Sequence, residues 1–237
     1  MSRVAVIQYP GSNCDLDALE IVQKVEKADA RLVWHKDLKN DYDAYVLPGG
    51  FSYGDYLRAG AIAATSPSLK IVREAVDQEK PVLGICNGFQ ILVEARLLPG
   101  AVLRNSGLRF VCTWTRLRVE TTRTPFTRLA QKGQALRVPI AHNEGRYYLD
   151  EKEIHELERK EQVVLRYVDE KNHPSKSANP NGSVDNIAGI CNEKGNVMGL
   201  MPHPERASLS ILSPDGQTYG KIIFDSMMNS LNGERAN

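Results

Sequence analysis

The residues of this chain best suited to covalent chemistry begin with a single cysteine. Cys86 stands between Gly84 and Gly88, and this G-x-Nuc-x-G spacing marks a strand-to-helix elbow that carries a nucleophile. Glycines at these places leave room for the backbones that cross at such a turn. The free N–H groups and the dipole of the following helix stabilise a thiolate there. The pattern favours a nucleophilic Cys86 over a structural core cysteine.

A base and an orienting acid for this thiol occur together far downstream. A nucleophile needs a base to take its proton and a third group to hold that base in one tautomer. His203 and Glu205 are two residues apart, and side chains at this spacing project to the same side of an extended segment. Pro202 and Pro204 favour that extended shape. The sequence therefore predicts a triad of Cys86, His203 and Glu205.

Two backbone positions are suited to stabilise an oxyanion. Acyl transfer requires donors where negative charge develops on the carbonyl oxygen. We expect one from the N–H of Asn87, directly after the nucleophile, and one from the N–H of Gly50, where glycine permits close approach to a ligand. With the triad, they predict a hydrolase that works through a cysteine acyl-enzyme. Cys14 lacks an elbow, and we interpret it as structural.

The first half of the chain reads as strands and helices in alternation. In an open parallel sheet, the site lies at the carboxyl ends of the strands, and both Gly50 and Cys86 follow such ends. We expect an α/β fold with an open, mostly parallel, flavodoxin-like sheet and flanking helices. The predicted strands are Val4–Gln8, Ala30–Trp34, Tyr42–Leu47 and the run from Val82 to Ile85, and the predicted helices are Asp15–Lys27, Ser68–Glu79 and Asn87–Arg96.

The second half changes character, and there we expect an antiparallel β insertion into the same fold. All of residues 1–237 are interpreted as one domain. The predicted elements are a strand or hairpin over Arg109–Val119, a strand over Leu136–Ile140, a surface helix over Asp150–Glu161, an exposed polar loop over Lys171–Ser183, a strand pair over Ile187–Cys191 and Val197–Met201, and a closing amphipathic helix over Gln217–Leu231.

Composition and charge limit the other functions. The chain has 237 residues and a formal net charge of +1, which gives no general attraction to nucleic acid or to an anionic membrane. Its four cysteines are far apart, so neither a metal site nor a disulfide framework is indicated. The apolar, strand-like segment that follows Met1-Ser2-Arg3 is too short for the hydrophobic region of a signal peptide or for a membrane span. We expect a cytoplasmic protein, where a reactive thiol stays reduced.

One stretch departs from this neutral balance. Residues 101–140 contain eight basic residues against one acid, Glu120. Such a bias indicates either a solvated face or a surface that docks an acidic partner. The basic residues are Arg104, Arg109, Arg116, Arg118, Arg123, Arg128, Lys132 and Arg137.

With these residues in place, the chain resembles the class I, or triad, glutamine amidotransferases. It is most similar to the glutaminase subunits of phosphoribosylformylglycinamidine synthases, which act in de novo purine synthesis. The elbow and the His-Pro-Glu are typical of the superfamily, whereas GFSYGD and HNEGR are typical of the subfamily. The similar segments cover nearly the whole chain: VIQYPGSNCD at 6–15, PGGFSYGD at 48–55, GICNGFQ at 84–90, HNEGRY at 142–147 and MPHPER at 201–206.

The resemblance implies a role for each matching residue. Cys86 would attack the side-chain amide of glutamine and form a glutamyl thioester as ammonia leaves. The resemblance also gives His203 the proton transfers, Glu205 the orientation of His203, and Gly50 and Asn87 the oxyanion contacts. It further implies that four residues bind or lie beside glutamine or the ammonia exit: Phe51, Gln90, His142 and Glu144.

The consumer of the ammonia is expected on another polypeptide. The chain contains neither a G-x-x-x-x-G-K-[ST] phosphate loop nor a G-x-G-x-x-G motif, so we expect no cofactor and no metal here. The resemblance implies a large synthetase subunit that binds ATP, magnesium and formylglycinamide ribonucleotide, together with a small bridging subunit. The basic stretch at 101–140 is a candidate for that interface.

Two other classes of protein remain as alternatives. The related superfamily of small stress proteins and proteases also uses a cysteine elbow, but its members typically place a histidine directly after the cysteine, where this chain has Asn87. A catalytically silent or regulatory binding subunit is the second alternative. Silent relatives usually lose the cysteine or the histidine, and Cys86 and His203 are both present.

Overall fold

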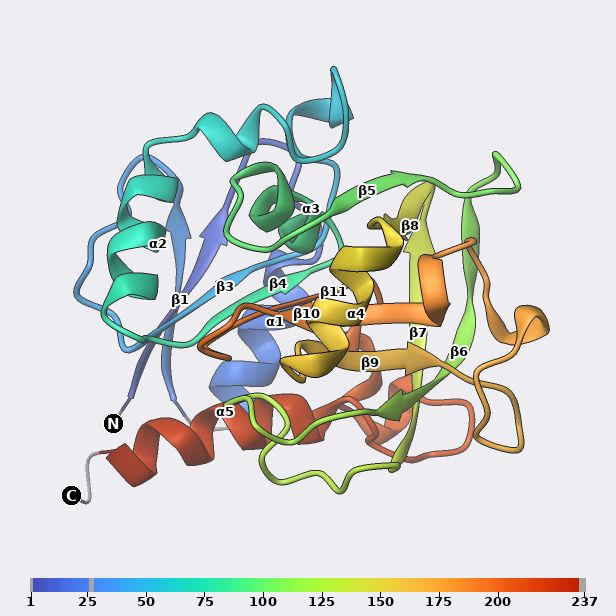
Figure 1. Cartoon of the computed structure of the whole chain (residues 1–237). Helices are drawn as coiled ribbons and strands as arrows, with labels where there is room; N and C mark the ends of the chain where they lie inside the picture. Colours follow the sequence, from blue (N-terminus) through green and yellow to red (C-terminus); the bar gives the residue numbers. More distant parts are fainter. Residues whose placement is uncertain (1, 26–27, 235–237) are drawn as a thin grey trace.

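The computed structural model of the chain describes residues 2–25 and 28–234, whose main feature is a nine-stranded sheet (Figure 1). The strand order is β2-β1-β3-β4-β11-β10-β9-β6-β7. Parallel pairing joins β1 (Arg3–Gln8), β2 (Asp29–Trp34), β3 (Ala44–Leu47), β4 (Val82–Ile85) and β11 (Val197–Leu200). Antiparallel pairing adds β10 (Ile187–Cys191), β9 (Val163–Tyr167), β6 (Val111–Val119) and β7 (Ala135–His142). The predicted α/β sheet with an antiparallel extension is confirmed.

Helices cover both faces of the parallel half. Helix α3 (Asn87–Glu94) packs against β3, β4 and β11, whereas α1 (Asp15–Glu20) packs against β1 and β2. In Figure 1, α2 (Ser68–Asp77) and α3 lie above the sheet, and α1 and α5 (Lys221–Glu234) lie below it. The predicted helix at Asp15–Lys27 continues from α1 as a π-helical segment to Val25, and residues 26–27 lie outside the described part.

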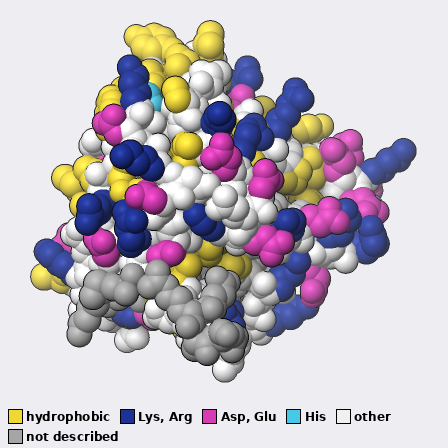
Figure 2. Space-filling model, turned by 90° about the vertical axis from the view of Figure 1, so that its left-hand side faces the viewer, with side chains coloured by type: hydrophobic (Ala, Val, Ile, Leu, Met, Phe, Trp, Pro, Cys, Tyr) yellow, Lys and Arg dark blue, Asp and Glu magenta, His cyan; other side chains and the backbone are white. Residues whose placement is uncertain are grey.

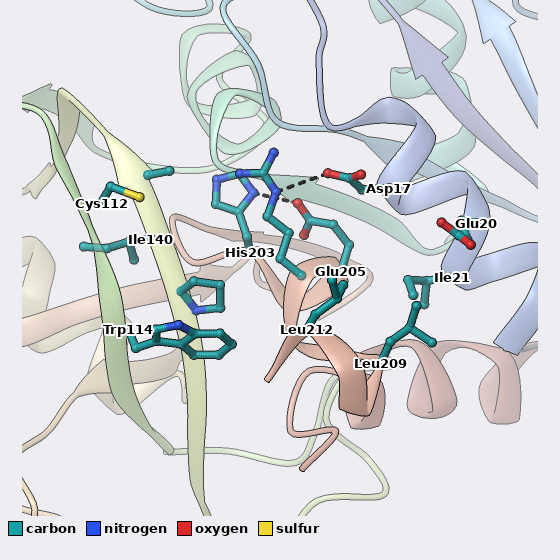
Figure 3. Close-up of a pocket in the computed structure, with 13 residues that line it drawn as sticks. Asp17, Glu20, Ile21, Cys112, Trp114, Ile140, His203, Glu205, Leu209 and Leu212 are labelled. Carbon is teal, nitrogen blue, oxygen red and sulfur yellow. Dashed lines mark hydrogen bonds and ion pairs between the residues drawn. The ribbon is translucent and has the colours of Figure 1, made fainter. Parts of the chain in front are cut away.

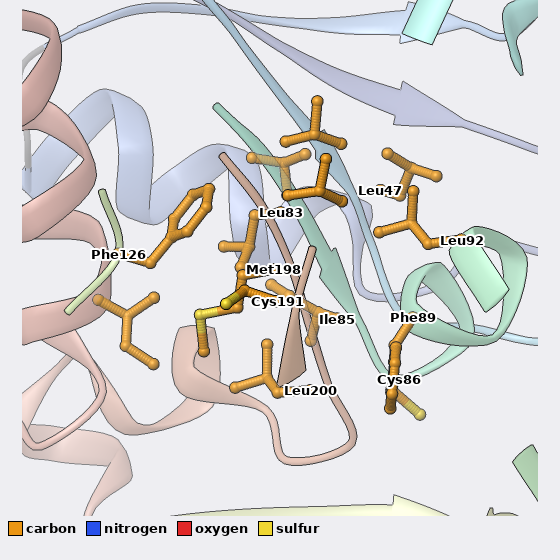
Figure 4. Packing of buried hydrophobic residues seen from close by; sticks show 14 of the residues in the cluster. Leu47, Leu83, Ile85, Cys86, Phe89, Leu92, Phe126, Cys191, Met198 and Leu200 are labelled. Carbon is orange, nitrogen blue, oxygen red and sulfur yellow. The ribbon is translucent and has the colours of Figure 1, made fainter. Parts of the chain in front are cut away.

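The core lies on both faces of the central strands, which are apolar throughout as parallel strands covered on both sides require. Every residue of β3, β4, β10 and β11 is buried. Figure 4 shows Leu83, Met198 and Leu200 packed together, with Phe126 on one side and Phe89 on the other. Cys86 lies at the edge of this cluster, so the elbow is anchored directly on the core.

Three strands in the middle of the chain were not predicted. These are β9 and the two members of a small antiparallel sheet, β5 (Ala101–Arg104) and β8 (Glu144–Tyr148). The prediction of a wholly exposed loop over Lys171–Ser183 was wrong at its end, because Asn181 and Ser183 are buried. Asn181 Nδ2 donates to the carbonyl of Gly145 over 2.8 Å, so the loop folds back to supply donors to β8.

The other predicted elements of the second half are present with small changes of boundary. β6 and β7 pair as a hairpin, and β10 pairs with β11 as expected. Helix α4 (Glu151–Arg159) begins after Asp150, whose carboxylate caps the N–H of Glu153 at 2.9 Å. α5 begins only at Lys221. Across residues 2–25 and 28–234, the structure contains no helix with the length and hydropathy to cross a lipid bilayer.

Much of the basic stretch serves the fold itself. Arg118 forms an ion pair with Glu120 at 2.7 Å, and Arg137 pairs with Asp215 at 3.3 Å. The guanidinium of Arg123 donates to three backbone carbonyls, of Glu161, Asn192 and Glu193. These residues therefore neutralise or cap neighbouring segments, and the exposed remainder of the stretch includes Arg104, Arg109 and Arg116.

Candidate active site

The elbow predicted around Cys86 has the expected geometry. β4 ends at Ile85, α3 begins at Asn87, and Cys86 between them has φ 49° and ψ −105°. A positive φ on a residue other than glycine is a strained conformation that surrounding structure must hold. A Cβ on Gly88 would lie 1.9 Å from the carbonyl oxygen of Leu47, so only glycine fits there. The tight crossing of α3 over β3 therefore holds the cysteine at the end of its strand.

His203 and Glu205 meet at the end of the neighbouring strand β11. His203 Nδ1 lies 2.6 Å from Glu205 Oε1, and both side chains are buried. The prediction of an extended His-Pro-Glu segment was wrong, because Pro204–Ala207 form a 3₁₀ turn. Proline is compatible with the first position of such a turn, because a backbone N–H at that position has no acceptor within the turn. Its absence in proline therefore costs no hydrogen bond. The turn brings the carboxylate back onto the imidazole, so the predicted contact forms by another route.

The charges around His203 favour its protonated form. Burial opposes a charge on the ring, but the interactions with Glu205 and Cys86 outweigh it and raise the pKa of His203 well above its usual range. Cys14 also approaches the imidazole. His203 Nε2 is buried and makes no hydrogen bond of ordinary length within the described part of the chain. That nitrogen remains available to exchange a proton with a reacting group.

A cavity of about 190 Å³ joins the predicted residues into one site. Cys86, His203, Gly50 and Phe51 all lie on its wall. Gly50 has φ +150°, and its N–H makes no hydrogen bond to any described residue. The N–H of Asn87 belongs to the first turn of α3, where backbone donors have no acceptor within the helix. The cavity is completed by Asn13, Cys14, Phe110, Ala141 and Arg206.

Three residues expected to contact glutamine are not on the wall of this cavity. Gln90 accepts from Asn87 Nδ2 at 2.9 Å, and its own amide nitrogen donates to the carbonyl of Glu144. The Glu144 carboxylate accepts from the N–H of Ala59 at 3.2 Å. Neither residue lines the cavity, and the same holds for His142. Their predicted contact with glutamine stays a prediction, and the hydrogen bonds show that Gln90 and Glu144 connect α3, β8 and the segment before α2.

His142 is the centre of a buried polar network. Its Nδ1 lies 3.1 Å from Asn105 Oδ1, and its Nε2 lies 3.4 Å from Asn181 Nδ2. Burial and the charge on His203 lower the pKa of His142 to about 4, so the ring is neutral at pH 7. The neighbouring carbonyl of Ala141 lies 3.9 Å from Cys86 Sγ. The network thus fixes the backbone that faces the nucleophile.

Arg206 and Cys14 are the two ionisable residues on the cavity wall that were not identified from the sequence as part of the site. Arg206 places its guanidinium 3.1 Å from Cys14 Sγ and 3.1 Å from a carboxylate oxygen of Asp17. Burial raises the pKa of Cys14, which opposes a thiolate there. Arg206 directly follows the His-Pro-Glu motif, and Cys14 lies in the PGSNCD segment. Their positions within or beside these motifs were the sequence feature that could have placed them in the site.

Cys14, His203 and Glu205 are also the only cluster in the described part of the chain with the spacing of metal ligands. One ligand atom from each lies within 4.8 Å of the others. The guanidinium of Arg206 and the protonated imidazole both place positive charge at this point. This electrostatic environment disfavours a cation and favours an anionic group in the cavity.

A larger cavity of about 400 Å³ also borders His203 (Figure 3). Its wall includes Trp114 from β6, Ile21 beyond α1, and Leu209 and Leu212 from the segment before α5. Ala141, His203 and Arg206 separate the two cavities, since they line both, whereas Glu205 lines only the larger one. Cys86 is not on this wall. The smaller cavity is therefore the one in which the nucleophile can react.

Comparison with known proteins identifies the family. The model of the CobB/CobQ-like glutamine amidotransferase domain matches residues 1–227. The chain belongs to this family. It is also 54% identical to phosphoribosylformylglycinamidine synthase subunit PurQ of Methanosarcina mazei, over 95% of this chain and 96% of that protein. The PurQ of Thermomicrobium roseum is 57% identical over 86% of this chain and 87% of its own length.

Solved structures agree with the family assignment. A chain in the structure of PurLQS from Thermotoga maritima is 45% identical, with a TM-score of 0.84 over 98% of this chain and all of that one. A glutamine amidotransferase from Thermotoga maritima, 18% identical, shares the fold with a TM-score of 0.54 over all of this chain and 86% of its own. Membership of the amidotransferase family replaces the alternative of a small stress protein.

Proposed function

We propose that this chain is the glutaminase subunit of a phosphoribosylformylglycinamidine synthase in purine biosynthesis. The observation that carries the proposal is the buried contact between His203 and Glu205 beside a cysteine on a nucleophile elbow, in a chain that belongs to the glutamine amidotransferase family. The PurQ relatives cover nearly its whole length at about half identity. Glutamine is the substrate, and glutamate and ammonia are the products.

The first half-reaction forms a thioester. The Cys86 thiolate attacks the side-chain amide carbon of glutamine, and the oxygen that becomes negative faces the N–H groups of Asn87 and Gly50. As the C–N bond breaks, the protonated His203 gives its proton to the leaving nitrogen, and ammonia departs. Glu205 stabilises the imidazolium before this transfer and keeps Nε2 directed at the reacting atoms.

The second half-reaction releases glutamate. The neutral His203 takes a proton from a water molecule, whose oxygen attacks the thioester carbon. The C–S bond then breaks, and the site returns to a thiolate beside an imidazolium. Arg206 on the cavity wall supplies positive charge that suits a carboxylate of the substrate.

The ammonia is used by a partner. We assign the ATP-dependent conversion of formylglycinamide ribonucleotide to formylglycinamidine ribonucleotide to a large synthetase subunit, which would hold ATP and magnesium, with a small bridging subunit completing the complex. A related chain of similar fold occurs in the PurLQS structure. We place the complex in the cytoplasm, where the four free cysteines would remain reduced.

The test measures glutamate release and ribonucleotide amination in the same mixture. The purified chain is combined with the synthetase, the bridging subunit, ATP, magnesium and formylglycinamide ribonucleotide, with either glutamine or ammonium chloride as nitrogen source. Cys86→Ala should abolish the glutamine-dependent reaction and leave the ammonia-dependent one intact. Glutamate release by Cys86→Ala would disprove the nucleophile assignment, and no release by the native chain would indicate a silent binding subunit.

A further inference from the structure

The segment between β3 and the 3₁₀ turn before α2, residues 51–59, has a strained backbone on the molecular surface; we call it the rim loop. Three of its residues other than glycine have left-handed backbone angles: Tyr53 (φ 53°), Asp55 (φ 54°) and Leu57 (φ 69°). Such residues cost conformational energy and persist where other contacts hold them. Strain of this kind concentrates at functional sites and switch regions.

The rim loop also exposes large apolar side chains. Tyr56 is 75% exposed and Leu57 is 89% exposed. Figure 1 shows the segment projecting from the top of the molecule, and Figure 2 shows hydrophobic side chains gathered at that end. At the base of the loop, Phe51 lies beside Phe110 with ring centroids 6.5 Å apart, and both line the Cys86 cavity. Phe51 therefore belongs both to the rim loop and to the wall of the active-site cavity.

Hydrogen bonds connect the rim loop to the residues behind the nucleophile. The N–H of Ser52 donates to Asn87 Oδ1 at 3.1 Å, and Asn87 Nδ2 donates to Asp55 Oδ1 at 3.4 Å. At the far end, the N–H of Ala59 donates to Glu144. Asn87 is also the residue to whose N–H we assign one of the two oxyanion contacts. A shift of the rim loop would therefore move the side chain of Asn87, and with it the backbone N–H of the same residue.

The ionised side chain of Asp55 lies in an unfavourable environment. Burial, with the nearby Glu144 carboxylate, raises the pKa of Asp55 to about 6. A half-buried carboxylate without an ion pair among the described residues contributes little to stability. Its acceptor oxygen is used by Asn87, which indicates that it positions that residue.

The charges around the rim loop indicate the character of what binds there. Arg58 and Arg104 are more than 60% exposed at their side chains although each pairs with a glutamate, and Arg109 is exposed between Leu108 and Phe110. An apolar patch edged by arginines fits a protein surface with apolar residues flanked by acidic ones.

We propose that the rim loop is the docking element through which the synthetase subunit activates the glutaminase. The synthetase covers Tyr56 and Leu57, which holds Asp55 against Asn87 and so fixes the oxyanion N–H. The identity of the partner rests on the proposed function. The mechanism would couple glutamine hydrolysis to the presence of the ammonia consumer.

The docking part of the proposal is tested by binding. The affinity of the chain for the purified synthetase with its bridging subunit is measured by calorimetry, for the native chain and for Tyr56→Ser/Leu57→Ser. The double variant should raise Kd at least about tenfold, as expected when central apolar contacts are removed. Ile211→Ser is the matched control, since Ile211 is 88% exposed but belongs to the segment beside the larger cavity. Equal Kd values for the double variant and this control would overturn the proposal.

The activation part is tested by kinetics. Asp55→Ala should bind the synthetase like the native chain but lose most of the rise in kcat for glutamine that the synthetase causes, with little change in KM. Asp55→Asn keeps an acceptor oxygen and should restore the rise, which a merely structural role would not predict. Full activation of Asp55→Ala, or no rescue by Asp55→Asn, would refute the coupling.

Controls separate this inference from the proposed function. If the native mixture makes product from glutamine while both sets of variants behave like the native chain, only the role of the rim loop is wrong. If the native mixture makes none, both proposals fail. Sedimentation of the native chain alone completes the test, because a dimer abolished by Tyr56→Ser/Leu57→Ser would assign the surface to a second copy and overturn the synthetase as its occupant.

Discussion

The neutral state of His142 makes the stability of the protein sensitive to acid. Protonating this ring would place a charge in a buried network whose nearest ionic neighbour is the protonated His203. Asn105 Oδ1 accepts from the Nδ1–H, and Asn181 Nδ2 donates to Nε2, so the network is complete only with a neutral ring. We predict that this residue makes a measurable contribution to acid destabilisation, which His142→Gln should remove.

The magnitude follows from the pKa values of the two states. With a pKa of about 4 in the folded chain and about 6.5 in the unfolded chain, about a tenth of folded molecules but nearly all unfolded ones carry this proton at pH 5. The unfolded state binds more protons in this range, so the free energy of unfolding falls as the pH falls. The loss between pH 7 and pH 5 amounts to about 2 kcal/mol from this residue alone.

His203 acts in the other direction and in a separate range. Its pKa is raised in the folded state, so the stability that it contributes is complete below about pH 6.5 and is lost as the pH rises toward the folded-state pKa. Below pH 6.5 it is protonated in both states and leaves the slope due to His142 unchanged. His35 also has a lowered pKa, caused by burial, and adds to the acid loss of every variant that retains it.

The assay is urea unfolding at pH 7 and pH 5, followed by circular dichroism. The native chain should lose about 2 kcal/mol more than His142→Gln between the two conditions. His155→Gln is the control, because His155 is exposed on α4 and should leave the native slope unchanged. An identical loss in the native chain and in His142→Gln would show that the folded chain accommodates a charged His142, and the electrostatic reasoning would be wrong.

Three further perturbations test the triad and the surface. Glu205→Gln should lower kcat by about 10³-fold or more with a smaller change in KM, because an amide cannot stabilise the imidazolium of His203; steady-state kinetics that show a change in KM alone would contradict the orienting role. Gly49→Ala places a Cβ 2.7 Å from His203 Cε1 and should lower kcat about 100-fold by displacing the ring, whereas Gly107→Ala, with open space around it, should match the native rate. Arg116→Glu reverses an exposed charge and should weaken synthetase binding in a pull-down if the basic stretch contributes to the interface; equal capture would assign it to solvated surface.

The strand-to-helix elbow at Cys86 could be located from sequence because its requirements are local and steric. Gly84 and Gly88 are needed whatever else the chain does, since the elbow brings backbone from β3 and α3 into contact at these positions. The contact between His203 and Glu205 was also predicted, although for the wrong backbone shape. Two residues separated by a single proline can approach each other either along an extended segment or around a 3₁₀ turn, and the motif itself does not distinguish the two.

The environment of His142 could not be predicted, because it is built by segments distant in the chain. Its partners Asn105 and Asn181 lie 37 and 39 residues away, on a β5–β6 connection and on a loop that the sequence indicates to be exposed. A histidine in a motif reads equally well as a ligand contact and as a buried scaffold. What decides is whether amide groups from elsewhere satisfy both ring nitrogens, and here they do. The network also holds the backbone beside Cys86, because the carbonyl of the neighbouring Ala141 lies 3.9 Å from Cys86 Sγ. The place of His142 near glutamine stays a prediction, and its partners within the fold account for its burial without a ligand.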